Sequence, residues 1–576
     1  MKRWMGLLFL LSVACILPSF IPLRDSEQPT AVTGTPTAEP TLRGIEDCVT
    51  PVPTFTPTPQ AVTPTSLPED PRLSREGALI LPRPLFASDR LTVDIDPIIP
   101  EFREDSYTVI LAFDDGRSLT SPVLPMGLIG EAQARFYWLA PFKSYSSTRT
   151  FTVTLTMADW VVDEVQQNNQ LVFTETVHPR SALLPPEPQA EWTYTETLGT
   201  RLHYITGSTA DRDLAELVSE AETAYQHVTR YLEASEDPVD VYILDRIIGQ
   251  GGYASSEWVA LSHTDRKYAP VTLSSVLKHE FTHRLDHSVH CDVAPSFLRE
   301  GLAVYVAGGH CENESLRHRA AVLLASEHYI PLTRLVNDFY SHQHEVGYWE
   351  AGSFVQYLVE TYGWELFSEV CKESARDGSG DQIGELDALS TSISSLGIGS
   401  FVEIERAWEA WLAESDVTSL DRHLLEGKLQ LMERMRAYQR SHDTAAHFTQ
   451  GILFSPAEAE RLGIVADFVR RPRQPEAIAI ELLLAMGYEA FAKNDLPMLR
   501  LCIDSVDSLL RNNSGLTSAD TRFDLAEDVL GIVDRALAQG YEPYRLIMQH
   551  PGYYRIQVLD REIWPQTREM VAVFDS

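Results

Sequence analysis

The sequence is poor in cysteine and in basic residues. Its 576 residues include six cysteines, too few for a disulfide scaffold, and 47 lysines and arginines against 82 aspartates and glutamates, a formal net charge of −35. Nucleic acids and anionic membrane surfaces are bound through clustered lysine and arginine, so we expect neither as a partner. The acidic surplus indicates a solvated surface. A hydrophobic content of 44% and this length predict several globular domains.

Long apolar runs are also scarce, but one lies at the N-terminus. Two basic residues precede an uncharged apolar run from Trp4 to Leu23, which is the pattern of an export signal. Residues 1–24 are thus interpreted as a signal peptide, or as a membrane or lipid anchor. Cleavage, retention as a spanning segment and lipidation at Cys15 stay open. We expect an exported protein attached through its N-terminus to the outer face of the cytoplasmic membrane or to the cell surface.

Residues 25–72 have the composition of a disordered linker. Ten prolines lie between Pro29 and Pro71, among threonines, alanines and glutamates, with few large apolar side chains. Such a segment cannot bury enough surface to fold, and proline makes it extended. The linker would hold the rest of the chain away from the cell envelope.

Residues 73–186 indicate an all-β module. Short runs that are rich in β-branched and aromatic residues recur at Leu91–Ile95, Tyr107–Phe113, Phe151–Leu155 and Leu171–Val177, and Asp114-Asp115-Gly116 is a turn signal. These runs predict an antiparallel β-sandwich. Asp163–Asn169 resembles the Asn-Asn turn of bacterial adhesion-related, immunoglobulin-like modules. That resemblance implies a spacer or a substrate-presenting module, and a dedicated ligand site is the alternative.

Alternating helix and strand patterns follow a proline-rich boundary at 185–188. Apolar residues recur at helical spacing from Leu214 to Leu232, and Val239–Leu244 has the pattern of a strand. Further apolar stripes continue to about residue 416. We therefore place a mixed helix-and-strand domain at residues 190–416.

The most informative stretch of this domain is Lys278-His279-Glu280-Phe281-Thr282-His283-Arg284. Two histidines four residues apart on a helix lie on one face, about 6 Å apart along its axis, which suits two imidazole ligands to one zinc ion. Glu280 is turned about 100° from His279, so its carboxylate can reach the water that the metal activates without binding the metal. The pattern predicts a zinc site with Glu280 as the general base.

A hydrolytic zinc site needs a third protein ligand and one open position. The metzincin pattern requires glycine three residues and histidine six residues after the second histidine, but these positions are Asp286 and Val289. That class is excluded. A following helix, introduced by Pro295 and ended by Gly308-Gly309, carries Glu300 instead. Glu300 is the predicted third ligand.

His279-Glu280-x-x-His283 followed by Leu-Arg-Glu-Gly-Leu-Ala around Glu300 resembles the gluzincin zinc metallopeptidases, the thermolysin and aminopeptidase group, in a bacterial exported form. The similarity extends over about residues 195–415. It implies an α+β gluzincin-type metallopeptidase domain with one zinc ion per chain, acting on a peptide or protein substrate.

A second stretch that carries the resemblance is Tyr348–Leu358, which is similar to the gluzincin segment that begins with a transition-state tyrosine. The resemblance implies that Tyr348 donates a hydrogen bond to the oxyanion of the tetrahedral intermediate. It also implies that Gly251–Ala254, leading to Trp258–Ser262, includes an edge strand along which an extended peptide docks. An ordinary sheet strand is the alternative.

Other cysteines and histidines offer a disulfide and candidate supporting groups for the site. Cys291 and Cys311 bracket the Glu300 helix, and a disulfide between them would fix that helix in an oxidising compartment, the alternative being two free thiols. Cys371 and Cys502 are expected to be core residues, and His287 and His290 to lie beyond the reach of the zinc. Three further histidines are expected to face solvent in loops, the alternative being that one of them assists Tyr348: His310, His342 and His344.

Residues 420–576 are expected to form an all-α, or mainly helical, C-terminal region. Pro475–Asn512 has the pattern of a helical hairpin broken at Asn494–Pro497, and Tyr553–Leu559 has the pattern of a strand. The sequence assigns this region no function.

Together these patterns predict an exported, surface-tethered zinc-dependent peptidase. The missing Gly-x-Met-Glu-Asn exopeptidase motif favours an endopeptidase over an aminopeptidase. The alternative is a non-catalytic cell-envelope binding or scaffold protein with a gluzincin fold and a structural zinc. Glu280 and an open fourth position favour the enzyme, because purely structural sites close with a fourth protein ligand.

Overall fold

The computed structural model describes residues 70–573 with internal gaps. These gaps are 76, 82–83, 88–89, 100–105, 127–130, 140–146, 159, 162, 164, 183–188, 235–237, 245–250, 264–267, 311, 338, 340–343, 376–383, 444–455, 463–473, 513–524, 539–545, 548–552 and 560–566. The predicted signal or anchor at 1–24 and nearly all of the linker at 25–72 lie outside the described residues. No helix of the described ranges is both long and apolar enough to cross a membrane.

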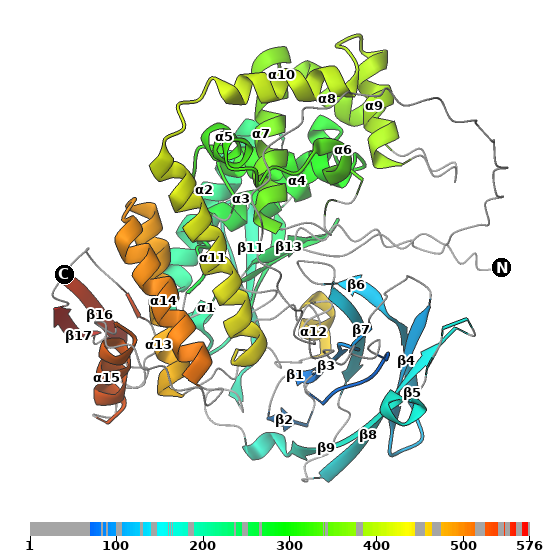
Figure 1. Ribbon diagram of the computed structural model, residues 1–576, viewed down its shortest axis with the longest axis vertical. Coiled ribbons are helices and arrows are strands. Elements are labelled where there is room, and N and C mark those ends of the chain that lie inside the picture. The colour runs from blue at the N-terminus through cyan, green and yellow to red at the C-terminus, as the bar shows by residue number, and fades with distance from the viewer. Residues whose placement is uncertain are drawn as a thin grey trace, which may run out of the picture.

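The N-terminal module consists of two sheets around one hydrophobic core (Figure 1). One sheet has the strand order β1-β3-β7-β6: Ala78–Leu81, Arg90–Ile95, Glu131–Leu139 and Leu124–Met126. The other has the order β2-β9-β8-β4-β5: Leu85–Phe86, Gln170–His178, Ser147–Met157, Tyr107–Phe113 and Ser118–Pro122. Strict alternation along β4 points every second side chain into the core.

This sandwich differs from the expected antiparallel one at a single strand, since β2 pairs in parallel with β9. The turn predicted at Asp114-Asp115-Gly116 joins β4 to β5, with Gly116 at a φ of 86°. Between the sheets, the rings of Phe151 and Phe173 stack 5.2 Å apart. The immunoglobulin-like topology stays a prediction.

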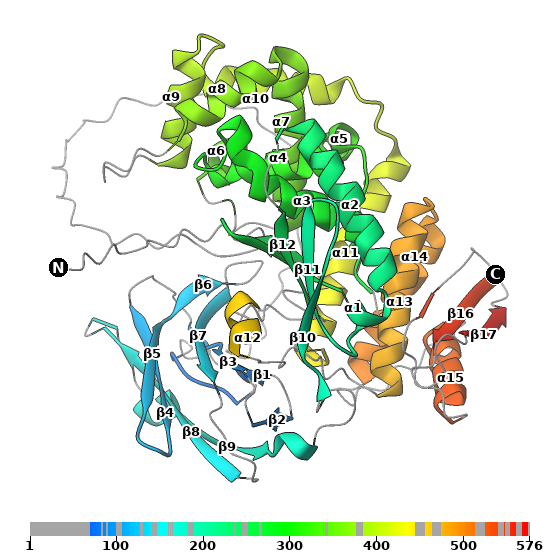
Figure 2. The same cartoon turned by 180° about the vertical axis from the view of Figure 1, so that it is seen from behind.

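A five-stranded sheet begins the next domain, in the order β10-β11-β12-β14-β13: Trp192–Glu196, Thr200–Ile205, Val239–Leu244, Trp258–Ser262 and Gly252–Ala254. The strands β11, β12 and β14 are parallel, whereas β10 and β13 run antiparallel to their neighbours. Helices α1 (Thr209–Arg212) and α2 (Leu214–Tyr231) follow β11, and α2 packs against β11 and α3 (Figure 2). Leu202, Val241 and Val259 bury one face of this sheet in the main core.

The helices that follow the sheet contribute buried side chains to the same core. They are α3 to α10 with the short helix η4 after α3: Leu273–Leu285, Asp286–Val289, Ser296–Ala307, Leu316–Ala325, Leu332–Leu335, His344–Tyr362, Trp364–Glu373, Glu385–Ser395 and Phe401–Ala413. Side-chain caps fix two of the starts, because Thr272 accepts from the backbone of Ser275 and Ser400 from that of Glu403. Gly308, at a φ of 82°, ends α4.

The predicted Cys291–Cys311 disulfide is wrong. Cys291 is bonded to Cys371 of α8, with Cα atoms 4.9 Å apart and both residues fully buried. Cys291 precedes the N-terminus of α4 and the segment 308–315 follows its C-terminus, so a helix about 18 Å long separates them. The turn before α4 instead contacts α8, where Ser368 donates a hydrogen bond to the Val289 carbonyl.

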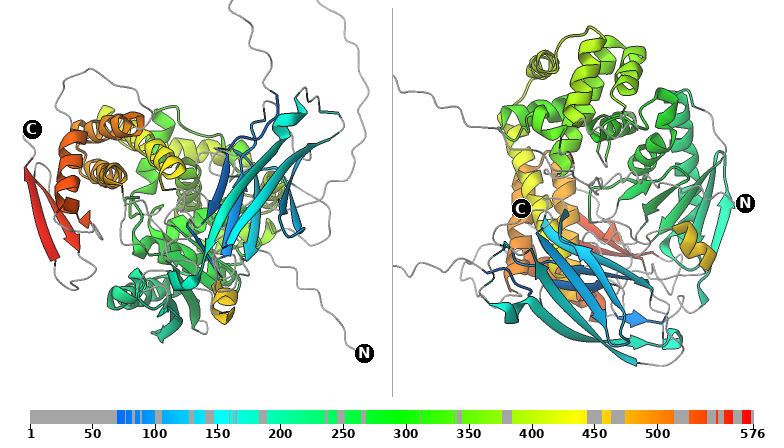
Figure 3. Two further views of the ribbon diagram at one scale, coloured as in Figure 1. Left: turned by 90° about the horizontal axis from the view of Figure 1, so that it is seen from below. Right: turned by 90° about the vertical axis from the view of Figure 1, so that its right-hand side faces the viewer.

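The C-terminal region was expected to be all-α or mainly helical, but it contains both helices and strands. Its helices α11 to α15 are Ser419–Ser441, Pro456–Leu462, Pro475–Ala492, Leu496–Asn512 and Leu525–Ala538. Three antiparallel strands, β15 to β17, follow them: Leu546–Ile547, Tyr553–Leu559 and Thr567–Val573. The predicted strand at 553–559 and the hairpin of α13 and α14 are confirmed. In the view from below, these strands and the β-sandwich lie at opposite sides of the molecule (Figure 3).

Candidate metal centre

The helix α3 brings two histidines to one point. Its buried face is formed by Leu277, Phe281 and Leu285, which pack in the main core. His279 and His283 lie one turn apart and are both buried, with their rings nearly perpendicular and 4.8 Å apart. Their Nε2 atoms are 3.1 Å apart. The two rings therefore present one nitrogen each to the same space.

Glu300 of α4 completes this group. Its Oε2 atom lies 3.2 Å from the Nε2 atom of His279 and 3.2 Å from that of His283. Ligands at about 2.0–2.1 Å from a tetrahedral zinc ion are about 3.3 Å from one another. The three donor atoms thus already have the mutual spacing of three ligands on one ion, and this group could hold a metal.

The protonation states of these residues also suit a metal. Burial lowers the pKa of His283 to about 4, so its ring is neutral near pH 7 and keeps a lone pair. Burial alone would raise the pKa of Glu300, but the two histidines beside it outweigh this effect and hold it well below its ordinary value. Neutral imidazole and ionised carboxylate are the forms that bind zinc.

Glu280 is buried beside this group without binding into it. It packs under the edge of the sheet, where a Cβ atom on Gly252 would lie 3.0 Å from the Cγ atom of Glu280. Among the described residues its Oε2 atom has no hydrogen-bond partner. Burial, reinforced by the negative charge of Glu300, raises the pKa of Glu280 well above its ordinary value. A buried carboxyl group with an uncommitted oxygen is suited to proton transfer.

The strand next to Glu280 is the edge of the five-stranded sheet. β13 pairs with β14 on one side and is the last strand in the order of that sheet. Glycine suits this position, because a Cβ atom there would crowd Glu280, Val276 and the carbonyl oxygen of Ala260. The predicted edge strand therefore lies directly over the α3 residues that carry the site.

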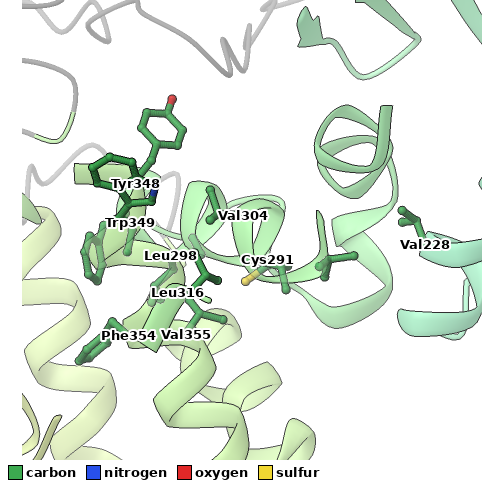
Figure 4. Packing of buried hydrophobic residues seen from close by; sticks show 14 of the residues in the cluster. Val228, Cys291, Leu298, Val304, Leu316, Tyr348, Trp349, Phe354 and Val355 are labelled. Atoms are coloured by element: carbon green, nitrogen blue, oxygen red, sulfur yellow. The ribbon is translucent and has the colours of Figure 1, made fainter. Parts of the chain in front are cut away.

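Tyr348 lies in the first part of α7, with its ring 6.1 Å from that of His279. The ring is buried, packs edge-on against Phe339 at 5.0 Å and stacks on His310 at 4.3 Å. Figure 4 shows the hydroxyl group of Tyr348 pointing away from the packed core side chains. The structure thus brings Tyr348 beside a predicted metal ligand, and its chemical role stays a prediction.

Close packing of two helices fixes Glu300 relative to Tyr348. A Cβ atom on Gly301 of α4 would lie 2.6 Å from the carbonyl oxygen of Ala351 on α7. Val304 and Val355 pack in the same interface (Figure 4). Because Gly301 follows Glu300 directly, the absence of a side chain there lets α4 approach α7 closely.

For three residues near the site, the structure shows surroundings other than those first expected. His310 was expected to face solvent, with assistance to Tyr348 as the alternative, and it is buried against the Tyr348 ring. Asp286 and Arg299 pair at 3.5 Å across the turn between the ligand helices. Burial raises the pKa of Asp286 to about 7 while Arg299 acts in the opposite direction. The sequence signal for this pair was its position, three residues after the second histidine and one before the third ligand.

Two other histidines lie as expected outside the ligand group. His287 and His290 are exposed, because α3 ends at Leu285 and His290 adopts a left-handed conformation with a φ of 57°. Tyr305, one turn beyond Glu300, packs against Tyr231 rather than entering the site.

The sequence matches no known protein family and no curated protein. Among solved structures it is similar to an aminopeptidase N family protein from Idiomarina loihiensis, with 9% identity and a TM-score of 0.25, over 60% of this chain and 77% of that chain. It is also similar to native leukotriene A4 hydrolase from Saccharomyces cerevisiae, with 12% identity and a TM-score of 0.26, over 78% of this chain and 89% of that chain. Because these TM-scores are low, function is inferred from the site itself.

Proposed function

We propose that this chain is a zinc-dependent peptidase that hydrolyses peptide bonds with Glu280 as its general base. One observation carries the proposal: His279, His283 and Glu300 present three donor atoms within 3.2 Å of one another, next to a buried carboxyl group that binds none of them. Two imidazoles and one carboxylate with an open fourth position form the ligand set of hydrolytic zinc sites.

The residues of the site divide the chemistry among them. A bound zinc ion would supply a water of lowered pKa, a Lewis acid for the scissile carbonyl, and a positive charge that favours ionised Glu280. Glu280 then takes the proton of the attacking water and passes it to the leaving amine. Tyr348 donates a hydrogen bond to the oxyanion that develops at the carbonyl.

We further propose that the substrate lies along β13 and is cut internally. An extended peptide can add, through its backbone, to the edge of β13 that no strand of the described residues pairs with, which gives binding that tolerates many sequences. Since Gly252 contacts Glu280, such a peptide would pass the general base with chain on both sides of the scissile bond. This arrangement supports an endopeptidase.

Export and surface tethering are part of the proposal as well. The charged start and apolar run of residues 1–24 support export. The disulfide between Cys291 and Cys371 adds support, because disulfides persist mainly in oxidising compartments outside the cytoplasm.

The test compares the intact protein with the Glu280→Gln variant on a diverse peptide mixture, read by mass spectrometry. Glutamine keeps the shape of the side chain but cannot accept the proton, so we expect cleavage to fall about 10²- to 10⁴-fold while zinc stays bound. The control is the zinc content of both proteins, measured by atomic absorption.

The cleavage products also separate the alternatives. Internal cuts would support an endopeptidase, and successive loss of N-terminal residues an aminopeptidase. Zinc in both proteins with equal cleavage, or with none, would contradict the proposal and favour a binding protein with a structural zinc.

A further inference from the structure

A buried cluster of charged and aromatic side chains joins the C-terminal region to the residues around Tyr348. We name it the Lys428 cluster. It draws on α11, α5, the segment 308–315, α7 and α13, and its members are Lys428, Arg319, Glu312, Glu314, Trp349 and Phe491.

Lys428 is at the centre of the cluster. Its side chain is 2% exposed, although it comes from a helix of the C-terminal region. Its Nζ atom lies 2.5 Å from the carboxylate of Glu312 and 3.8 Å from that of Glu314. The same ammonium group lies 4.9 Å from the ring centre of Trp349, which adds a cation–π contact.

Glu314 links this charge to α7. It accepts a hydrogen bond from the indole nitrogen of Trp349 at 2.5 Å and one from Arg319 at 3.0 Å. The guanidinium group of Arg319 also lies 5.6 Å from the ring centre of Trp349. Two cations and two carboxylates therefore balance one another in a region where an uncompensated charge would be costly.

Both carboxylates belong to the segment that also carries His310. Trp349 directly follows Tyr348 on α7 (Figure 4), and His310 stacks on the ring of Tyr348. The cluster thus holds the tyrosine in two ways, through its neighbour in the helix and through the segment that presses His310 onto its ring. Lys428 and Phe491 are the members that come from outside the predicted peptidase domain, and of these two only Lys428 is charged.

We propose that Lys428 is a positioning residue for Tyr348, so that the C-terminal region is a working part of the active site. This inference rests on the proposed role of Tyr348 as oxyanion donor. Removing the ammonium group would leave Glu312 and Glu314 with one buried cation instead of two, and the segment 308–315 would move towards solvent to hydrate them. His310 would then leave Tyr348, whose hydroxyl would lose its orientation.

The experiment uses the full chain with a Lys428→Met substitution, which keeps an unbranched side chain of similar length between the two aromatic rings. The matched control is Arg434→Met, which lies on the same helix. Arg434 forms a doubly hydrogen-bonded pair with Asp507 of α14 at 3.0 Å, inside the C-terminal region. Both changes remove a cation of α11 together with its ion pairs, but only the first touches the cluster.

Steady-state kinetics give the first measurement. We expect Lys428→Met to lower kcat about tenfold to a hundredfold with KM changed less than about twofold, and Arg434→Met to change neither. In a Tyr348→Phe background, Lys428→Met should lower kcat little further. Adding Glu312→Gln to Lys428→Met should restore part of kcat, because it removes the uncompensated charge.

Hydrogen exchange measured by mass spectrometry gives a second measurement, which does not depend on activity. Peptides covering 308–315 and 344–349 should exchange faster in Lys428→Met than in Arg434→Met. Equal kcat in these two variants, or an undiminished loss in the Tyr348→Phe background, would overturn the inference. If the intact protein cuts no peptide, the proposed function fails, and equal exchange of the two variants at these peptides would then reject the positioning role separately.

Discussion

At the scale of single residues, the two histidines of the candidate metal group could be found from sequence because helix geometry sets their spacing, and Glu300 because it lies near the start of the following helix. His279 and His283 are one turn apart on any helix, and Glu300 follows at the start of the next one. The burial of His310 could not be found in this way, because it involves a contact with Tyr348 on another element and not a helical spacing. The disulfide of Cys291 was missed for the same reason.

A buried pair outside the metal centre gives a prediction about pH. Asp213 accepts hydrogen bonds from Arg212 at 2.8 Å and from His263 at 3.0 Å, and its side chain is 6% exposed. Burial acts to raise the pKa of Asp213, but these two partners outweigh it and hold the pKa below the ordinary value of 3.8. The ionised carboxylate therefore stabilises the fold at pH values above the pKa of an aspartate in the unfolded chain. This stabilisation is lost as the pH falls below that pKa towards the lower pKa of the folded state.

We expect Asp213→Asn to lower the free energy of unfolding by about 3 kcal/mol at pH 7, because it removes the negative charge that faces the largely buried guanidinium group of Arg212. As the pH falls below about 4, the intact protein loses the same contribution and the difference should shrink. Urea unfolding of both proteins at pH 7 and at pH 3 would measure this. A difference that does not change with pH would contradict the assignment.

At the scale of elements, strands and helices with a strong period were predicted well. The strand at 239–244 and helix α3 are where the apolar pattern placed them. The packing of α4 on α7 could not be foreseen, since it depends on which small residue meets which backbone. Gly301 had no evident role in the sequence, yet it sets the distance between the helices that carry Glu300 and Tyr348.

This contact predicts that Gly301→Val separates the two helices. A side chain at Gly301 would overlap the carbonyl oxygen of Ala351, so we expect a loss of about 1–3 kcal/mol in the free energy of unfolding and weaker zinc binding as Glu300 moves. The control is Gly384→Ala, where the added Cβ would lie 3.5 Å from its nearest neighbour, Asn337. Denaturant midpoints and competition with a zinc chelator measure both effects. Equal results for the two variants would show that the contact is not needed.

At the scale of the whole molecule, composition separated the regions but could not show how they are joined. The sequence placed a domain boundary near residue 416, between the predicted peptidase domain and a region to which it assigned no function. In the structure, Tyr268 is buried in the hydrophobic core of the C-terminal region. This tyrosine precedes α3 in the chain. Its hydroxyl donates a hydrogen bond to Asp443 at 2.8 Å, across 175 positions of sequence.

Because one tyrosine belongs to both regions, we expect them to unfold together. Tyr268→Ala would leave a cavity in the C-terminal core and remove the hydroxyl that donates to Asp443, at a cost of about 3–5 kcal/mol. In calorimetry, the intact protein should show one transition for the two regions, and the variant should show it at lower temperature or split in two. Limited proteolysis gives an independent check. A stable fragment that ends before α11 and still binds zinc would show that the peptidase domain folds alone, and the C-terminal region would then be an accessory module.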